Sequence, residues 1–143
     1  MSEEQADTPI LLMLDDDQED ALLVSTALRR AQLPLSFTHI QTSEQFGAYL
    51  GQIEAWLAQR PVALLLDLNM PGKSGLDWLA RLRQQSELKC LRIIVFSTSC
   101  ASEERLRTLA LGADEHIGKP DSVAELVTVL SAVYERWISS KEW

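Results

Sequence analysis

Charged residues stand directly after short apolar runs at three widely separated places in the chain. These residues are Asp15 with Asp16, Asp67, and Lys119. If the apolar runs are neighbouring parallel strands, their carboxyl ends lie on one edge of a sheet and the charged side chains converge there. Carboxylates and an ammonium gathered in one place suit a divalent cation and a phosphoryl group. The spacing therefore predicts one assembled pocket.

Each group taken alone also has a simpler interpretation. Acidic residues such as Asp15 and Asp16 commonly cap the start of a helix. Lys119 and Ser97 fit ordinary surface positions at strand ends. Asp67 is harder to explain in this way, because a carboxylate directly after a buried strand is costly to desolvate unless a cation or hydrogen bonds compensate. The agreement of all these positions favours a site.

The composition fits a single domain with protein partners. A chain of 143 residues is long enough to bury a core without disulfides or structural metals. The formal net charge is −8 and the isoelectric point is near 4.7. Since phosphate backbones are held by clustered lysines and arginines, we expect no direct binding of nucleic acid.

The sequence gives no sign of secretion or membrane insertion. Cys90 and Cys100 are too few for a disulfide framework and do not have a metal-ligand spacing. Residues 2–8 are acidic and polar, unlike a signal peptide. No apolar stretch is long enough to span a bilayer. We expect a soluble cytoplasmic protein with reduced thiols.

Strands and helices are predicted to alternate along the chain. Apolar or β-branched runs predict five strands, at 10–14, 35–40, 62–66, 91–96 and 115–118. Helical spacing, capping hydroxyls and carboxylates, and Pro or Gly at the exits predict five helices, at 18–32, 42–60, 76–83, 102–112 and 121–137. Such alternation produces right-handed crossovers. The predicted fold class is α/β, a doubly wound parallel sheet of five strands.

One segment carries a specific resemblance. Residues 64–72 read LLLDLNMPG and are followed by Ser74-Gly75. Together with Asp15-Asp16, Ser97 and Lys119-Pro120, this segment resembles the CheY-like receiver domain of two-component response regulators. The resemblance spans about residues 10–137 and implies a flavodoxin-like sheet with strand order 2-1-3-4-5. It implies a receiver domain at 9–138 between a disordered tail at 1–8 and a C-terminal tail at 139–143.

The resemblance implies a role for each acidic residue. Asp67 would be the phosphoacceptor, attacking a phosphoryl group carried on a histidine of a partner kinase or phosphotransfer protein. Asp16, Asp67 and the backbone carbonyl of Asn69 would bind Mg²⁺, and Asp15 would orient metal-bound water or the neighbouring ligands. Mg²⁺ commonly combines a few carboxylates with waters and a phosphate, which fits so sparse a set of ligands.

The same resemblance assigns the residues that respond to phosphorylation. Ser97 and Lys119 would bind the phosphoryl oxygens, and the Lys119-Pro120 peptide is expected to be cis. His116 stands where the family often has the aromatic switch residue, and a histidine there also titrates near neutral pH. Asn69 and Ser99 match positions that tune access of the hydrolytic water.

The resemblance also implies how the protein signals. The chain ends soon after the last predicted helix, so we expect a stand-alone receiver that acts through phosphorylation-dependent contact with a downstream protein or passes phosphate in a relay. Such small receivers resemble those paired with phytochrome-type kinases. We expect a homodimer through the fourth helix, fifth strand and fifth helix, extended by Ile138 and Trp143. We expect no turnover of an external substrate.

Two other functions remain open. A phosphohydrolase of the haloacid dehalogenase type also uses an aspartate nucleophile after a buried strand, but that family has a second acid two residues later where this chain has Asn69. A pseudo-receiver adaptor would signal without phosphate, although every acidic position of the site is filled in this chain.

Overall fold

The computed structural model describes residues 8–70, 74–98 and 101–139. The strands are β1 (Ile10–Leu14), β2 (Ser36–Ile40), β3 (Val62–Leu66), β4 (Arg92–Ser97) and β5 (Glu115–Gly118). The α-helices are α2 (Gln18–Ala31), α3 (Ser43–Leu57), α4 (Gly75–Gln84), α5 (Ser102–Ala110) and α6 (Val123–Val133). A 3₁₀ turn, η1 (Ser86–Leu88), follows α4, and a π-helical turn, η2 (Tyr134–Ile138), follows α6. Within these ranges no helix is both long and apolar enough to cross a membrane.

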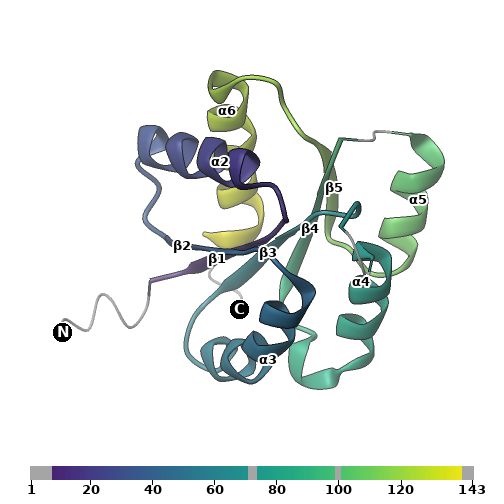
Figure 1. The fold of residues 1–143 in the computed structure, drawn as a ribbon. Coiled ribbons are helices and arrows are strands. Elements are labelled where there is room, and N and C mark those ends of the chain that lie inside the picture. Colours follow the sequence, from purple (N-terminus) through teal and green to yellow (C-terminus); the bar gives the residue numbers. More distant parts are fainter. Residues whose placement is uncertain (1–7, 71–73, 99–100, 140–143) are drawn as a thin grey trace.

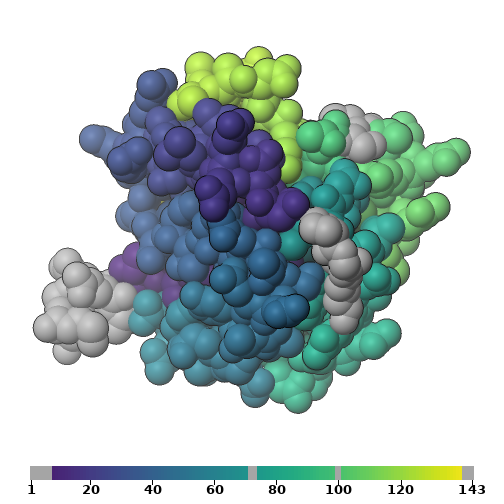
Figure 2. Space-filling view, in the orientation of Figure 1, coloured from purple at the N-terminus to yellow at the C-terminus, as the bar shows by residue number. Residues whose placement is uncertain are grey.

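The sheet has the predicted order and direction. All neighbouring strands pair in parallel, in the order β2-β1-β3-β4-β5. Helices α2 and α6 pack on one face, and α3, α4 and α5 cover the other (Figure 1). Side chains fill the spaces between the ribbons (Figure 2). The predicted doubly wound α/β fold is therefore confirmed, and the strand ends that carry the charged residues share one edge.

Burial on both faces explains the continuous apolar runs. Every residue of β1 and β3 is buried. In β1, Leu12 and Leu14 pack on the α3 side, whereas Leu11 and Met13 pack on the α2 side. Because alternate side chains of a strand point to opposite faces, a sheet covered by helices on both faces needs apolar residues at every position.

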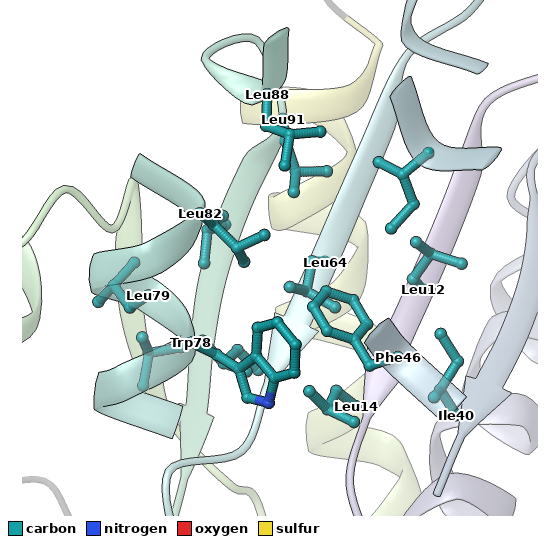
Figure 3. Packing of buried hydrophobic residues seen from close by; sticks show 14 of the residues in the cluster. Leu12, Leu14, Ile40, Phe46, Leu64, Trp78, Leu79, Leu82, Leu88 and Leu91 are labelled. Carbon is teal, nitrogen blue, oxygen red and sulfur yellow. The ribbon is translucent and has the colours of Figure 1, made fainter. Parts of the chain in front are cut away.

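A tryptophan organises the core on the α3 side. Trp78 of α4 is 2% exposed, and its ring meets Phe46 of α3 edge to face at a centroid distance of 4.8 Å (Figure 3). Its indole Nε1 donates a hydrogen bond to Ser43 Oγ at 3.0 Å. The polar atom of the buried ring is thus satisfied while the ring fixes α4 against α3.

Several predicted helix ends differ from the structure, and those of α3 and the last helix are the most informative. Helix α3 ends at Leu57, short of the predicted residue 60. The backbone N–H groups of Gln59 and Arg60 both donate to the Trp56 carbonyl, so the helix tightens into a turn. A residue before a proline disfavours the helical conformation, and Arg60 precedes Pro61. The last helix changes to π geometry after Val133 and ends at Ile138 rather than at residue 137.

The prediction of a cis peptide between Lys119 and Pro120 is wrong, because this bond is trans in the structure. The trans form is the more stable isomer of most X-Pro bonds. The Lys119 backbone N–H donates to the Ser97 carbonyl at 2.8 Å. With the backbone held in this way, the lysine side chain reaches the acidic residues from a trans bond.

Several predictions fall outside the described residues. These concern most of the N-terminal tail, the loop residues 71–73, Ser99 and Cys100, and the C-terminal residues 140–143 with Trp143.

A glycine sets the distance between α4 and the loop that follows β3. A Cβ on Gly75 would lie 2.5 Å from the carbonyl oxygen of Asp67 and 2.7 Å from Cα of Leu68. The Gly75 N–H also donates to the Leu68 carbonyl at 3.3 Å. Only a residue without a side chain allows the start of α4 to approach Asp67 so closely.

We therefore predict that Gly75→Ala destabilises the protein by about 1–3 kcal/mol, because backbone atoms would have to move to accept the methyl group. The matched control is Gly51→Ala in α3, where a Cβ would meet nothing within 4 Å. That change should stabilise the protein by about 0.5–1 kcal/mol, since alanine favours a helix over glycine. Urea unfolding of both variants measures the difference, and equal stability of the two would contradict this account of Gly75.

Candidate functional site

The predicted convergence of charged residues is present at the carboxyl edge of the sheet. Asp15, Asp16 and Asp67 each offer one carboxylate oxygen, and these oxygens all lie within 4.8 Å of one another. The Lys119 Nζ lies 2.8 Å from Asp15 Oδ2 and 3.7 Å from Asp67 Oδ1. The ends of β1, β3 and β5 thus contribute to one cluster, as parallel strands require.

Asp15 is the most deeply buried carboxylate of the cluster, with 1% of the residue exposed. Its Oδ1 accepts a hydrogen bond from the Asp17 N–H at 2.9 Å, and its Oδ2 accepts one from Lys119. Burial raises the pKa of Asp15, and the hydrogen bonds from Lys119 and Asp17 offset this only in part. The side chain is therefore held rigidly by two donors.

Asp67 is also buried, and within the described part of the chain its carboxylate accepts a backbone hydrogen bond. It is 6% exposed, and its Oδ1 accepts a hydrogen bond from the Asn69 N–H at 3.2 Å. Its own backbone N–H donates to the Leu14 carbonyl at 3.0 Å, which ties the end of β3 to the end of β1. Asp16, in contrast, is exposed. The cluster therefore combines an accessible carboxylate with two buried ones.

Lys119 lies among the acids with only 11% of its side chain exposed. Burial by itself lowers the pKa of the ammonium, but hydrogen bonds to Asp15 and Asp20 outweigh burial, so the pKa is raised above its ordinary value. The ammonium stays protonated. A fixed positive charge beside Asp67 can offset the charge of an incoming anion.

Asp20 is a site residue that the sequence analysis missed. Its Oδ2 accepts a hydrogen bond from Lys119 Nζ at 2.7 Å. Asp17 caps α2, and its Oδ1 accepts from the N–H groups of Glu19 and Asp20. An acid in the first turn of a helix interacts favourably with the helix dipole, and this structural role was enough to explain Asp20 from its sequence position. Asp20 differs from its neighbour Glu19 because the Lys119 ammonium lies beside it, and only the structure shows this contact.

Two further residues contact the site without having been predicted. His39 of β2 donates a hydrogen bond from Nε2 to the Asp15 carbonyl at 2.6 Å, since a carbonyl oxygen can only accept. The second is Thr98, which lines the cleft formed by the acidic residues. A hydroxyl run at 97–99 was the available signal for Thr98, whereas pairing of β1 with β2 was needed to place His39.

The two residues expected to respond to phosphorylation lie away from the cleft surface. Ser97 is fully buried at the end of β4 and is not among the described residues that line the cleft. His116 of β5 is 4% exposed, and its Nδ1 shares a hydrogen bond with Thr108 Oγ1 of α5 at 2.8 Å. Its ring therefore contacts α5 rather than Asp67. Asn69 lines the cleft.

The cleft fits a hydrated divalent cation. It has a volume of about 180 Å³ and is lined by Asp15, Asp16, Asp17, Asp20, Asp67, Asn69, Thr98 and Lys119. Its donors are oxygen atoms, which Mg²⁺ and Mn²⁺ prefer over nitrogen or sulfur. The negative charge exceeds what one lysine balances, so a cation would be attracted to Asp16 and Asp67.

Comparison with known proteins gives relatives of one family. Residues 10–131 match the model of the response regulator receiver domain. The chain is 32% identical over 126 residues to the transcriptional regulatory protein GltR of Pseudomonas aeruginosa, covering 88% of this chain and 49% of GltR. It is 25% identical over 141 residues to the response regulator Rcp1 of Synechocystis sp., covering 98% of this chain and 96% of Rcp1. The chain thus spans about half the length of GltR but nearly all of Rcp1.

Solved structures agree in fold. The phosphorylated cyanobacterial phytochrome response regulator RcpA superposes with a TM-score of 0.77 at 29% identity, covering 94% of this chain and 96% of RcpA. The Mn²⁺-bound form of Rcp1 gives a TM-score of 0.75 at 23% identity, covering 92% of this chain and 95% of that one, and shows likeness of fold. The predicted similarity to the phytochrome-associated kind of receiver is supported by RcpA.

The family match covers most of the chain, and the structure places an acidic cleft with an adjacent lysine at the carboxyl edge of its sheet. The chain belongs to the receiver domain family of two-component response regulators.

Proposed function

We propose that the protein accepts a phosphoryl group on Asp67 in the presence of Mg²⁺ and signals by phosphorylation-dependent contact with another protein. The observation that carries this proposal is the setting of Asp67. Its carboxylate is buried at the sheet edge, 3.7 Å from the Lys119 ammonium and beside the oxygens of Asp15 and Asp16. A nucleophilic carboxylate flanked by a fixed positive charge suits the transfer of an anionic group.

Each residue of the site has a defined part in the proposed transfer. The Asp67 oxygen bonds to phosphorus while the bond from phosphorus to the donor, a phosphohistidine nitrogen, breaks. Lys119 offsets negative charge on the phosphoryl oxygens from a position already beside Asp67. Asp15 holds Lys119 through the hydrogen bond at 2.8 Å. In our proposal the hydroxyl of Ser97 moves to the phosphoryl group from its buried position.

Mg²⁺ would be held by Asp16, Asp67 and the carbonyl of Asn69, with Asp15 orienting this shell. When bound, the cation neutralises charge between the carboxylates and the phosphoryl oxygens. The chemistry of the oxygen donors and the Mn²⁺-bound form of Rcp1 support this assignment. His39 contributes indirectly, because its hydrogen bond restrains the Asp15 backbone.

The proposed donor is a sensor histidine kinase or a phosphotransfer protein. The similarity to RcpA, a phytochrome response regulator, supports a donor kinase of the phytochrome type. We place the protein in the cytoplasm, with a protein rather than a nucleic acid as its target. The free, exposed thiol of Cys90 suits a reducing compartment, and the net charge of −8 disfavours nucleic acid.

The protein is not proposed to be a turnover enzyme. A phosphohydrolase of the haloacid dehalogenase type places a second acid two residues after the nucleophile, and this chain has Asn69 there. A pseudo-receiver adaptor would have no use for the complete cluster of carboxylates around Lys119. Both alternatives give different outcomes in the phosphorylation experiment below.

We propose that the output and dimer surface lies on α5, β5 and α6. Leu106 and Leu109 of α5 are 68% and 40% exposed, and their spacing of three residues puts both on one face of the helix. His116 of β5 contacts the inner side of the same helix through Thr108. In this proposal His116 is the switch residue, and a change at its ring alters the position of α5.

Acetyl phosphate with Mg²⁺ should add one phosphoryl group to the wild type and none to Asp67→Asn, because the amide is no nucleophile. The matched control is Asp77→Asn, an exposed acid of α4 outside the cleft lining, which should react like the wild type. Intact mass measures the product. Steady release of phosphate without a stable adduct would indicate a phosphohydrolase, and no reaction of the wild type would indicate an adaptor.

Mg²⁺ should stabilise the folded protein through Asp16. At about ten times its dissociation constant, the cation raises the free energy of unfolding of the wild type by about 1.4 kcal/mol. Asp16→Asn should lose most of this gain because it removes an exposed carboxylate ligand, whereas Asp77→Asn should keep it. Thermal unfolding with Mg²⁺ and with a chelator measures the effect. An undiminished gain in Asp16→Asn would refute the assignment of this ligand.

Leu106→Glu should weaken self-association of the phosphorylated protein at least about tenfold, since a charge replaces an apolar contact at the centre of the proposed surface. Leu22→Glu is the matched control, because Leu22 is 63% exposed on α2, a helix that is not part of the proposed surface. Sedimentation with and without beryllofluoride measures the mass. A monomer at all concentrations in the wild type, or equal effects of the two substitutions, would exclude this dimer surface.

A further inference from the structure

The contacts of Lys119 are unequal. Its Nζ lies 2.7 Å from Asp20 Oδ2 and 2.8 Å from Asp15 Oδ2, both within hydrogen-bond distance. The distance to Asp67 Oδ1 is 3.7 Å, which is an ion-pair distance but too long for a hydrogen bond. In this state the ammonium is bound on the α2 side of the cleft rather than to Asp67.

The start of α2 fixes the position of Asp20. Asp17 caps the helix and accepts hydrogen bonds from the N–H groups of Glu19 and Asp20. Asp17 is itself joined to Asp15, whose Oδ1 accepts its N–H at 2.9 Å. The loop from β1 and the first turn of α2 therefore form one hydrogen-bonded unit that presents two carboxylates to Lys119.

The surroundings strengthen the contact between Asp20 and Lys119. A narrow apolar space beside the pair is lined by Leu23, Val24, Phe96, Pro120 and Leu126. The Lys119 side chain is 11% exposed and that of Asp20 is 28% exposed. Fewer waters compete for the ammonium than on an open surface, so an ion pair here is screened less than most surface pairs.

The backbone of Lys119 is held in place, whereas its side chain is a flexible stem that can adopt other rotamers once its hydrogen bonds break. The Lys119 N–H donates to the Ser97 carbonyl at 2.8 Å, and the next residue, Pro120, has its backbone φ angle fixed by its ring. A shift of Nζ toward Asp67 therefore requires rotation of the side chain and loosening of its contact with Asp20.

We propose that Asp20 is a positioning residue that holds Lys119 on the α2 side of the cleft and so opposes the phosphoryl-bound state. This inference rests on the proposed function of Asp67. Asp20 opposes the phosphoryl-bound state through two effects. It competes with phosphoryl oxygens for the ammonium, and as an acid lining the same cleft it repels the incoming anion.

The inference predicts that removal of Asp20 favours the phosphoryl-bound state. Asp20→Ala should bind beryllofluoride, a mimic of the phosphoryl group, roughly three- to tenfold more tightly than the wild type with Mg²⁺ present. Asp20→Glu should restore wild-type affinity to within about twofold, because it retains the charge. Glu19→Gln is the matched control, since it removes an exposed charge from the same helical turn without a described contact to Lys119.

The experiment has two readouts on the full chain. Fluorine NMR titration with beryllofluoride and Mg²⁺ gives the affinity. Nitrogen-detected NMR of the lysine ammonium groups, without beryllofluoride, reports whether Lys119 is held in the unphosphorylated protein. Asp20→Ala should shift the Lys119 signal and speed its hydrogen exchange, and Glu19→Gln should leave it unchanged.

An unchanged Lys119 signal in Asp20→Ala overturns the proposal, because the contact would then be absent in solution. Unchanged or weaker beryllofluoride affinity also overturns it, as does an equal gain in Glu19→Gln, which would reflect net charge alone. If Asp20→Ala fails to fold, Asp20→Asn takes its place and should act in the same direction with a smaller effect. If the wild type itself binds no beryllofluoride, the proposed function fails, and this inference fails with it.

Discussion

The concentration of negative charge around the largely buried ammonium of Lys119 is the constraint on which the site depends. Asp15, Asp20 and Asp67 surround Lys119, and Asp16 completes the cluster from the exposed side. Carboxylates this close repel one another unless positive charge lies between them. One lysine cannot neutralise all of them, so the folded protein retains an attraction for a cation at the point where an anion is proposed to react.

The sheet makes this arrangement possible. Parallel strands bring the ends of β1, β3 and β5 together, and burial of β1 and β3 on both faces fixes the register that places Asp15 and Asp67 side by side. Hydrogen bonds between loops refine the position, since the Asp67 N–H donates to the Leu14 carbonyl. Gly75 then lets α4 approach the same loop. The elements around the cleft therefore serve both stability and chemistry.

The site residues that could be predicted from the sequence are those that directly follow a strand, because the ends of parallel strands lie at one edge of the sheet. An apolar run buried on both faces reads plainly as a strand, so Asp15, Asp67 and Lys119 could be placed on one edge. Asp20 could not, because a capping acid and a site acid have the same sequence signature at the start of a helix. Placing it required the path of the Lys119 side chain.

Other parts depended on tertiary contacts that a sequence pattern does not contain. His39 reaches the Asp15 carbonyl only because β2 pairs with β1. The isomer of the Lys119-Pro120 peptide was predicted from resemblance and was wrong, since local backbone contacts decide between two isomers of similar free energy. Pro61 was used to predict the end of α3 at Arg60, but the helix ends at Leu57, because Gln59 and Arg60 form a turn on the Trp56 carbonyl before the proline.

The central claim is that Asp67, among several neighbouring carboxylates, is the group that accepts phosphate. Its most direct test is chemical identification of the modified residue. The phosphorylated protein is reduced with borohydride, which converts an acyl phosphate to an alcohol, and the digested peptides are sequenced by mass spectrometry. The account predicts reduction at Asp67 alone. Reduction at Asp15, Asp16 or Asp20 instead would contradict it.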